Sequence, residues 1–171
     1  GGGSMQSVER ALSIYESIVD EGAIGVTELA KTADIPKSTA HRYLTALTRA
    51  GYLINDGGIY RPSYRMLTQS RVHRSHSRLF EAALKQLSEL TTRFGETVNL
   101  TIRERGKRVI IYQTASMNAV YDCRIGDYTP LHQTAAGKGM FAWLPTETVD
   151  AIIDKHGLSA ATEHTITDRE T

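Results

Sequence analysis

Hydrogen-bonding and cationic side chains follow one another at helical spacing between Pro36 and Gly51. Cations can neutralise phosphates, and hydroxyl, imidazole and guanidinium groups can hydrogen-bond to base edges in the major groove of DNA. The set contains no acidic residue, and its members are Lys37, Ser38, Thr39, His41, Arg42, Thr45 and Arg49. The pattern predicts a helix that reads DNA.

An apolar stripe defines the other face of this stretch. It consists of Ala40, Tyr43, Leu44 and Leu47, at i, i+3, i+4 and i+7. Pro36 suits the first helical position because its missing N–H costs nothing there. Gly51 suits the end of the helix, where a left-handed backbone is common.

A shorter helix is predicted just before this one, which completes a helix-turn-helix. Thr27 can cap it, and Glu28 adds negative charge in the first turn, where the helix dipole favours it. An earlier helix is predicted from a cap at Ser7 to Gly22, with a stripe that should pack under the helix-turn-helix. That stripe consists of Val8, Leu12, Tyr15 and Val19, reinforced by Ala11, Ile14 and Ile18.

A β-hairpin is predicted directly after the second helix. Two short β-prone runs, 52–54 and 59–61, flank Asn55-Asp56-Gly57-Gly58, and Asp-Gly between such runs favours a tight turn. A hairpin at this place is a wing, and Arg61 on its return strand can reach a phosphate.

Positive charge is concentrated in one segment. Eight Lys and Arg stand against one acid, Asp56, between Lys37 and Arg78, a net +7 in a chain of net charge +1. A merely solvated helix face is the alternative reading of a polar stripe, but such a face normally mixes both signs. The segment therefore favours nucleic-acid binding.

Composition limits the remaining possibilities. The 171 residues allow one large or two small domains. A single cysteine, Cys123, forbids an internal disulfide, which fits a reducing compartment, and no apolar run reaches the length of about 18 residues that spans a membrane. Residues 1–4 are typical of an artificial leader, so the fold is predicted from residue 5. We expect a cytoplasmic protein without contact to a membrane.

The rest of the chain alternates helices and strands. A polar linker helix is predicted over 63–78 and an amphipathic helix from Leu79 to about Phe94. Strands are predicted at 96–102, 108–113 and 120–124, with a polar turn at 103–107. Residues 128–130 should lead through a loop into a small-residue helix before Leu144, and another helix should start at Pro145. The class is α+β.

Residues capable of catalysis or metal binding form no recognisable motif. Ala136-Gly137-Lys138-Gly139 lacks the spacing of a phosphate loop. His132 has no carboxylate partner evident in sequence, and Cys123 on a predicted strand is better explained by packing. We therefore expect neither an enzyme nor a metal or cofactor site.

Three stretches resemble the IclR family of transcription regulators. Ser7-Val-Glu-Arg-Ala-Leu is similar to its opening helix. Thr27-Glu-Leu-Ala with Ile35-Pro-Lys-Ser-Thr-Ala-His-Arg-Tyr-Leu resembles its helix-turn-helix, a specific match. Pro130-Leu-His-Gln-Thr-Ala-Ala-Gly-Lys-Gly resembles its most recognisable effector-domain segment, and Gly95-Glu-Thr-Val-Asn-Leu also fits.

The resemblance implies a sequence-specific transcription regulator, of the repressor type, whose operator binding responds to a small effector, usually an organic acid. It further implies a winged helix-turn-helix domain at 5–62, a linker helix at 63–78 and a GAF-like effector domain at 79–171. The family's effector domain normally continues further, so only its N-terminal part is expected here. Homodimers or tetramers on a palindromic double-stranded operator are also implied. The alternative is a GAF-like sensor, interaction module or enzyme that does not bind DNA.

Two sets of site residues follow from these expectations. The predicted DNA contacts are Thr27, Lys37, Ser38, Thr39, His41, Arg42, Thr45 and Arg61. The predicted effector contacts are Tyr121, Thr129, Thr134, Ala135, Ala136 and Gly137. Small residues let a ligand come close, and N–H groups at a helix start favour an anion. The alternative is that these small residues only let the helix pack tightly on the sheet.

Overall fold

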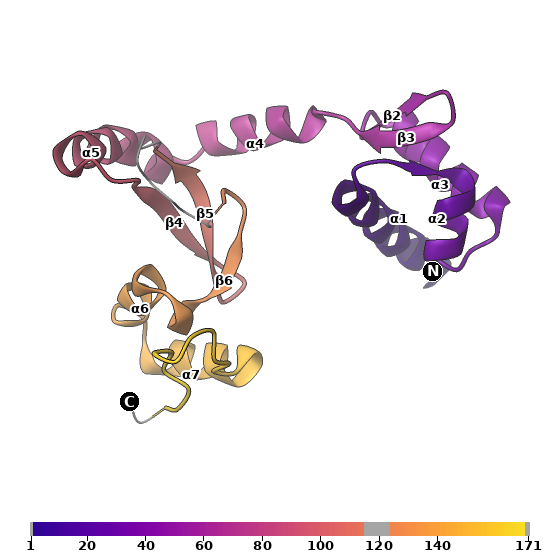
Figure 1. Ribbon diagram of the computed structural model, residues 1–171. Helices are drawn as coiled ribbons and strands as arrows, with labels where there is room; N and C mark the ends of the chain where they lie inside the picture. Colours follow the sequence, from indigo (N-terminus) through magenta and orange to yellow (C-terminus); the bar gives the residue numbers. More distant parts are fainter. Residues whose placement is uncertain (1, 115–123, 170–171) are drawn as a thin grey trace. The chain divides into compact units, whose positions relative to one another are not determined.

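The computed structural model describes residues 2–114 and 124–169, and divides into two compact units at His73 and Arg74. Figure 1 shows both units and the helix α4 (Arg65–Ser75), which crosses the division. The first unit contains α1 (Gly2–Glu21), β1 (Ile24–Gly25), α2 (Val26–Thr32), α3 (Lys37–Arg49), β2 (Leu53–Asp56) and β3 (Ile59–Pro62). No helix among the described residues could cross a membrane.

One apolar core holds the first unit together. Three helices pack with a small antiparallel sheet of strand order β1-β3-β2. Ile18, Leu29 and Leu44, from three different helices, are completely buried. The full core comprises Ile14, Ile18, Ile24, Leu29, Ala30, Ile35, Ala40, Leu44, Leu53 and Tyr60.

The turn between α2 and α3 is tight. Asp34 has a positive φ of 49°, a left-handed conformation that Asp tolerates better than most residues. The N–H of Ile35 donates to the carbonyl of Ala30 at 3.0 Å, and the Ile35 side chain enters the core. Pro36 lies just before α3, and its carbonyl accepts the N–H groups of Thr39 and Ala40.

The wing hairpin is confirmed, with Gly57 and Gly58 as its two-residue turn. Asp56 pairs with Ile59, and both glycines have positive φ, 62° and 95°. This is the geometry of a type I′ turn, which glycine adopts without strain.

Two predicted helix caps are wrong. Gly25, not Thr27, precedes α2, because β1 pairs with β3 and runs directly into the helix. Thr27 lies exposed within the first turn. Likewise α1 begins at Gly2 rather than after Ser7, since exposed N–H groups at a helix start can bond to water without a side-chain cap. Gly22 ends α1 as predicted, with φ 82°.

Only part of the predicted stripe of α1 packs on the core, where Tyr15 contacts it beside the reinforcing residues Ile14 and Ile18. Ile14 and Ile18 enter the core, whereas Val8, Leu12 and Val19 are 57%, 58% and 47% exposed. The two rows are neighbours around the helix, and the periodicity alone did not show which one meets the core. The exposed row leaves an apolar strip on this unit.

The second unit packs helices with a three-stranded antiparallel sheet of order β4-β5-β6. Its elements are α5 (Arg78–Phe94), β4 (Asn99–Glu104), β5 (Lys107–Gln113), β6 (Tyr128–Pro130), the short 3-10 helix η1 (Leu131–Gln133), α6 (Ala135–Phe141) and α7 (Thr146–His156). The Ser77 side chain caps α5, and Gly95 ends it in the left-handed conformation.

Strand predictions in this unit need correction. The predicted strand at 120–124 falls mostly outside the described residues, and Arg124 is not in a strand. The third strand described is β6, at residues expected to lead into a loop, where pairing with β5 supplies hydrogen bonds that local sequence does not reveal. The β4–β5 turn is Arg105-Gly106 alone, so both strands extend into the predicted polar turn.

Shortening a buried side chain in the core of the first unit should lower the free energy of unfolding. We expect Leu44→Ala to lower the free energy of unfolding by about 2–5 kcal/mol, because Leu44 is fully buried and its removal leaves a cavity. Leu67→Ala on α4, where Leu67 is 67% exposed, is the matched control and should cost well under about 1 kcal/mol. Urea unfolding followed by circular dichroism measures both, and equal losses would contradict the packing described.

Candidate functional site

The outward face of α3 presents a polar stripe. Ser38, Arg42, Thr45 and Arg49 are all exposed and recur at i, i+4, i+7 and i+11. At 3.6 residues per turn they lie opposite Ala40 and Leu44, which are fully buried. The burial of one face therefore sets the orientation of the other.

A shallow hollow of about 470 Å³ runs along this face. It joins α3 to the start of α1 and is lined by Ser7, Thr39, His41, Arg42, Tyr43, Thr45, Ala46 and Arg49. Four predicted DNA contacts therefore come together. Lys37 and Ser38 are exposed on the first turn of α3 but do not line it.

Arg49 was missing from the predicted contacts. It lines the hollow with Arg42, seven residues earlier, and the two lie on the same stripe. The i+7 spacing from Arg42 to Arg49 in the sequence was sufficient to place Arg49 on the same helix face and to include it among the predicted contacts. Thr27 lies on α2 and does not line the hollow.

The wing lies beside the second half of α3. A hollow of about 240 Å³ is lined by Thr45, Thr48 and Arg49 of the helix and by Asn55 and Tyr60 of the hairpin. The Asn55 side chain also accepts the N–H of Gly58 at 2.8 Å, which fixes the turn. A ligand that contacts α3 here also meets the hairpin.

Arg61 is engaged by an acid of its own hairpin. Its Nε donates to Asp56 at 3.0 Å, with 44% and 65% of the two side chains exposed. An exposed ion pair of this kind is worth at most about 1 kcal/mol, so a phosphate can compete with Asp56 for Arg61.

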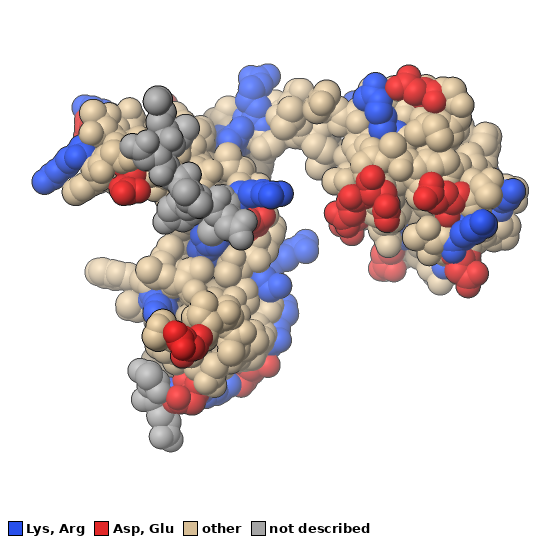
Figure 2. Space-filling view, viewed as in Figure 1, with Lys and Arg blue, Asp and Glu red and all other residues tan. Residues whose placement is uncertain are grey.

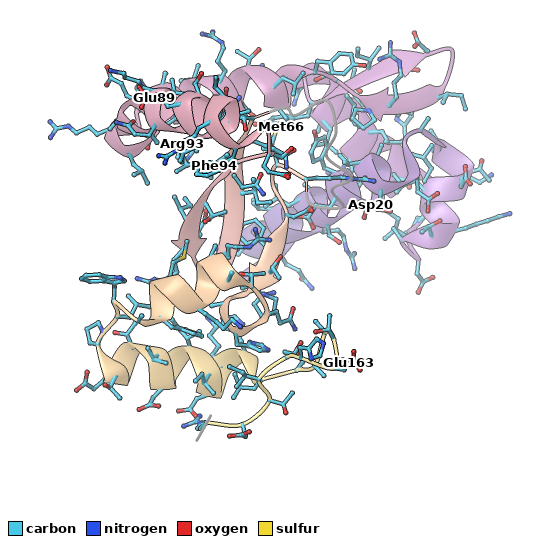
Figure 3. All side chains as sticks on the ribbon, turned by 60° about the vertical axis from the view of Figure 1, so that its left-hand side comes forward. Asp20, Met66, Glu89, Arg93, Phe94 and Glu163 are labelled. Carbon is cyan, nitrogen blue, oxygen red and sulfur yellow. The ribbon has the colours of Figure 1, made fainter. Side chains whose placement is uncertain are left out.

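Charge is segregated between two helices of this unit. Lys37, Arg42 and Arg49 lie on α3, which has no acid, whereas α1 carries four acids and one cation, Arg10. Figure 2 shows acidic patches over the region that α1 occupies in Figure 1. Asp20 near the end of α1 is labelled in Figure 3. The face built by α3 is thus the one suited to a polyanion.

Tyr52 connects the start of α4 to this unit. Its hydroxyl accepts from Gln69 at 3.3 Å, the Arg65 guanidinium lies 5.3 Å from its ring centre, and the Tyr15 ring meets it edge-on. The hydrogen bond from Gln69, aided by Arg65, lowers the pKa of Tyr52, whereas burial and then Tyr52 itself raise the pKa of Tyr15. These contacts fix the first turns of the linker helix.

The predicted effector residues are only partly brought together. Thr134 caps α6 by accepting the N–H of Gly137 at 3.0 Å. Gly137 is buried, and a Cβ there would collide with the Leu131 backbone, so its small size serves packing. Ala135 and Ala136 are exposed, Thr129 accepts from Arg108 at 2.9 Å, and Tyr121 lies outside the described residues.

An open apolar groove of about 530 Å³ adjoins this stretch. Ala136 is the one predicted effector residue in its lining, and Trp143 is 91% exposed. The remaining lining residues are Leu79, Thr101, Ile102, Arg103, Gly139, Met140 and Leu144. In the described parts of the chain, no group of three or more His, Cys, Asp or Glu is placed to hold a metal.

Comparison with known proteins identifies the family. A model of the bacterial transcriptional regulator IclR C-terminal domain matches residues 72–171, and one of the IclR helix-turn-helix domain matches residues 7–57. The chain belongs to the IclR family. It is 30% identical to the transcriptional repressor IclR of Escherichia coli, over 96% of this chain and 62% of that protein.

Solved IclR structures share the fold. The Thermotoga maritima IclR superimposes with a TM-score of 0.79 at 24% identity, covering 97% of this chain and 68% of that one. An IclR homologue from Microbacterium hydrocarbonoxydans, solved with 4-hydroxybenzoate, gives 0.76 at 23% identity, covering 94% and 68%. The chain spans 54–65% of the length of several curated relatives that it matches.

The small residues at the start of α6 should differ in how well they tolerate a larger side chain. We expect Gly137→Ala to destabilise the second unit by about 1–3 kcal/mol, since the added methyl group overlaps the Leu131 backbone. Ala135→Ser, at an exposed position of the same helix, is the control and should be within about 0.5 kcal/mol of the parent. Thermal unfolding measures both, and a fully stable Gly137→Ala variant would disprove the close approach.

Proposed function

We propose that this chain is part of a transcription regulator that binds a specific double-stranded DNA site through α3 and the wing. The observation that carries the proposal is the exposed, acid-free stripe of Ser38, Arg42, Thr45 and Arg49 on a helix whose other face is buried. The hairpin beside the helix adds Arg61 and Asn55. Family membership supports this function, because one matching model describes a bacterial transcriptional regulator and the other a helix-turn-helix domain.

The two compact units support a proposed division of labour. We assign DNA binding to residues 5–62, linkage to 63–78 and effector binding to 79–171. Lys37, Ser38, Thr39, His41, Arg42 and Thr45 are proposed contacts from α3, with Thr27 of α2 and Arg61 of the wing as backbone contacts. Repression is the proposed outcome, since the Escherichia coli relative carries that name. The cytoplasm, which contains bacterial DNA, is the proposed location.

A gel shift tests the interface directly. We expect Arg42→Ala to weaken binding to a cognate promoter fragment by about 1–3 kcal/mol if Arg42 reads a base, and to relax preference at that base pair. If Arg42 contacts phosphate instead, all sequences should weaken alike and the salt slope should fall by about one. Arg93→Ala on α5, an exposed arginine of the second unit, is the matched control. Unchanged affinity for every sequence would remove Arg42 from the interface.

A homodimer on a palindromic operator is proposed from the exposed strip on α1. Met5, Val8, Leu12 and Val19 are 47–71% exposed, which is unusual for one helix face of a small unit. Several apolar residues of the linker α4 are also exposed, including Met66, which Figure 3 labels. A second copy that covers the strip would place two α3 helices on two half-sites. Pairs of such dimers would give tetramers.

A charge placed in the strip should break the dimer. We expect Leu12→Lys to sediment as a monomer at micromolar concentration, because a buried lysine without a partner is costly. Leu90→Lys on α5, at a position 39% exposed, is the control and should leave the sedimentation coefficient unchanged. A parent chain that is monomeric at micromolar concentration and binds DNA as one copy would refute the proposal.

A small organic acid is the proposed effector class. The IclR homologue solved with 4-hydroxybenzoate supports it, because that ligand combines a carboxylate with an apolar ring. The stretch Thr134–Gly137, with Thr129 and Tyr121, is the proposed contact region, and Ala136 lines the apolar groove.

A further inference from the structure

Arg108 is a buried charge for which residues 2–114 and 124–169 supply no counter-ion. The residue is 5% exposed in the middle of the sheet, on β5. Its Nη2 donates to the hydroxyl of Thr129 at 2.9 Å, a neutral partner. Its Nε is buried and finds no acceptor within hydrogen-bond distance in the part of the chain that the structure describes. Burial of a guanidinium in this state is unfavourable unless an anion completes the site.

The strand register brings more positive charge to the same place. Arg108 pairs with Arg103 on one side and with Thr129 on the other, so these three side chains form a row across the three strands. Like charges directly opposite each other destabilise a sheet. An anion bound to the row would relieve both this repulsion and the burial cost of Arg108.

The acid nearest to Arg103 in sequence, Glu104, interacts with Tyr128. Glu104 follows Arg103 on β4, so its side chain leaves the opposite face of the sheet. Burial first, and then the hydrogen bond and charge of Glu104, raise the pKa of Tyr128, which shows that this carboxylate interacts with the phenol. Between residues 103 and 108 the chain holds four cations and one acid, a local excess that attracts anions.

We propose that Arg108 and Thr129 form an anion subsite for the carboxylate of a small organic acid. The planar guanidinium offers donors in the fork geometry that a carboxylate matches, and the Thr129 hydroxyl lies beside it. Arg103, one strand away, lines the apolar groove, so an acid with a hydrophobic body finds apolar surface next to the subsite. This inference rests on the proposed effector function and names the group that receives the acid.

Thermal unfolding of the whole chain tests the subsite with defined probes. Acetate and benzoate should raise the Tm in a concentration-dependent manner, whereas acetamide and benzamide, which have the same shapes without the charge, should not. Arg108→Met should abolish the response to both acids, and Arg108→Lys should weaken the apparent affinity by about ten-fold or more because the fork is lost. Arg105→Met, at the exposed β4–β5 turn, is the matched control and should respond like the parent.

A second readout does not depend on the choice of acid. Without ligand, Arg108→Met should unfold at the same temperature as the parent or higher, since an unpaired buried charge is replaced by an apolar side chain. A large fall in Tm would show that Arg108 is already satisfied and would overturn the inference. Carboxylate responses that are absent in the parent, or that persist in Arg108→Met, would overturn it as well.

Failure of the subsite and failure of DNA binding are separable. Hydrogen exchange of residues 107–113 and 128–130 should slow when benzoate binds, whatever happens at α3. Slowing without any DNA binding would retain the subsite and refute the regulator proposal. DNA binding that depends on Arg42, without any slowing of exchange by benzoate, would retain the regulator proposal and refute the anion subsite.

Discussion

The packing of α3 against the apolar core determines which of its side chains reach solvent. Ala40 and Leu44 are fully buried against α1, α2 and the small sheet. A shift of one residue would rotate the helix by about 100° and carry polar side chains into the core. Because an unpaired buried arginine is far more costly than a buried alanine, the core selects one rotation of α3. The polar stripe that includes Arg42 and Arg49 is the consequence of this selection.

The linker helix depends on a different kind of contact. None of the residues of α4 is buried, so its apolar side chains do not join either core. Near its start, Arg65 and Gln69 hold it to Tyr52 of the first unit. Near its end, Arg74 donates to the carbonyl of Ile111 and lies over the Phe80 ring, both in the second unit. A few polar and ring contacts at each end therefore join the helix to each unit.

Local signals in the sequence were sufficient for the elements nearest to DNA. The apolar spacing of α3, Gly22 and Gly51 as helix ends, and Asp-Gly at the hairpin each act through nearest neighbours in the chain, and each was predicted. The exposure of Val8, Leu12 and Val19 on α1 was not predicted. The neighbouring row that contains Ile14 and Ile18 is equally apolar, and only tertiary packing determines which row meets the core. The Thr27 cap failed because pairing of β1 with β3 shifted the helix start.

The second unit was harder to predict for the same reason. The third strand described, β6, has three residues, too few for a periodic pattern, and exists because it pairs with β5. Arg108 and Thr129 are 21 positions apart, so their contact follows from register alone. No spacing rule indicates such a pair. The motif at Thr134–Gly137 was visible, yet only the structure separates Gly137, which packs on Leu131, from the exposed Ala135.

Segregated charge explains how a nearly neutral chain can present a surface for DNA. The acids of α1 and the cations of α3 belong to different helices of the first unit, and the net charge of +1 is a sum over the whole chain. At physiological ionic strength the Debye length is about 8 Å, close to the distance of roughly 8–10 Å between packed helix axes. Exposed charges on two packed helices that are separated by such a distance are therefore partly screened from one another. A polyanion that approaches α3 therefore experiences its three cations rather than the average of the chain, and the acids of α1 disfavour docking by that face.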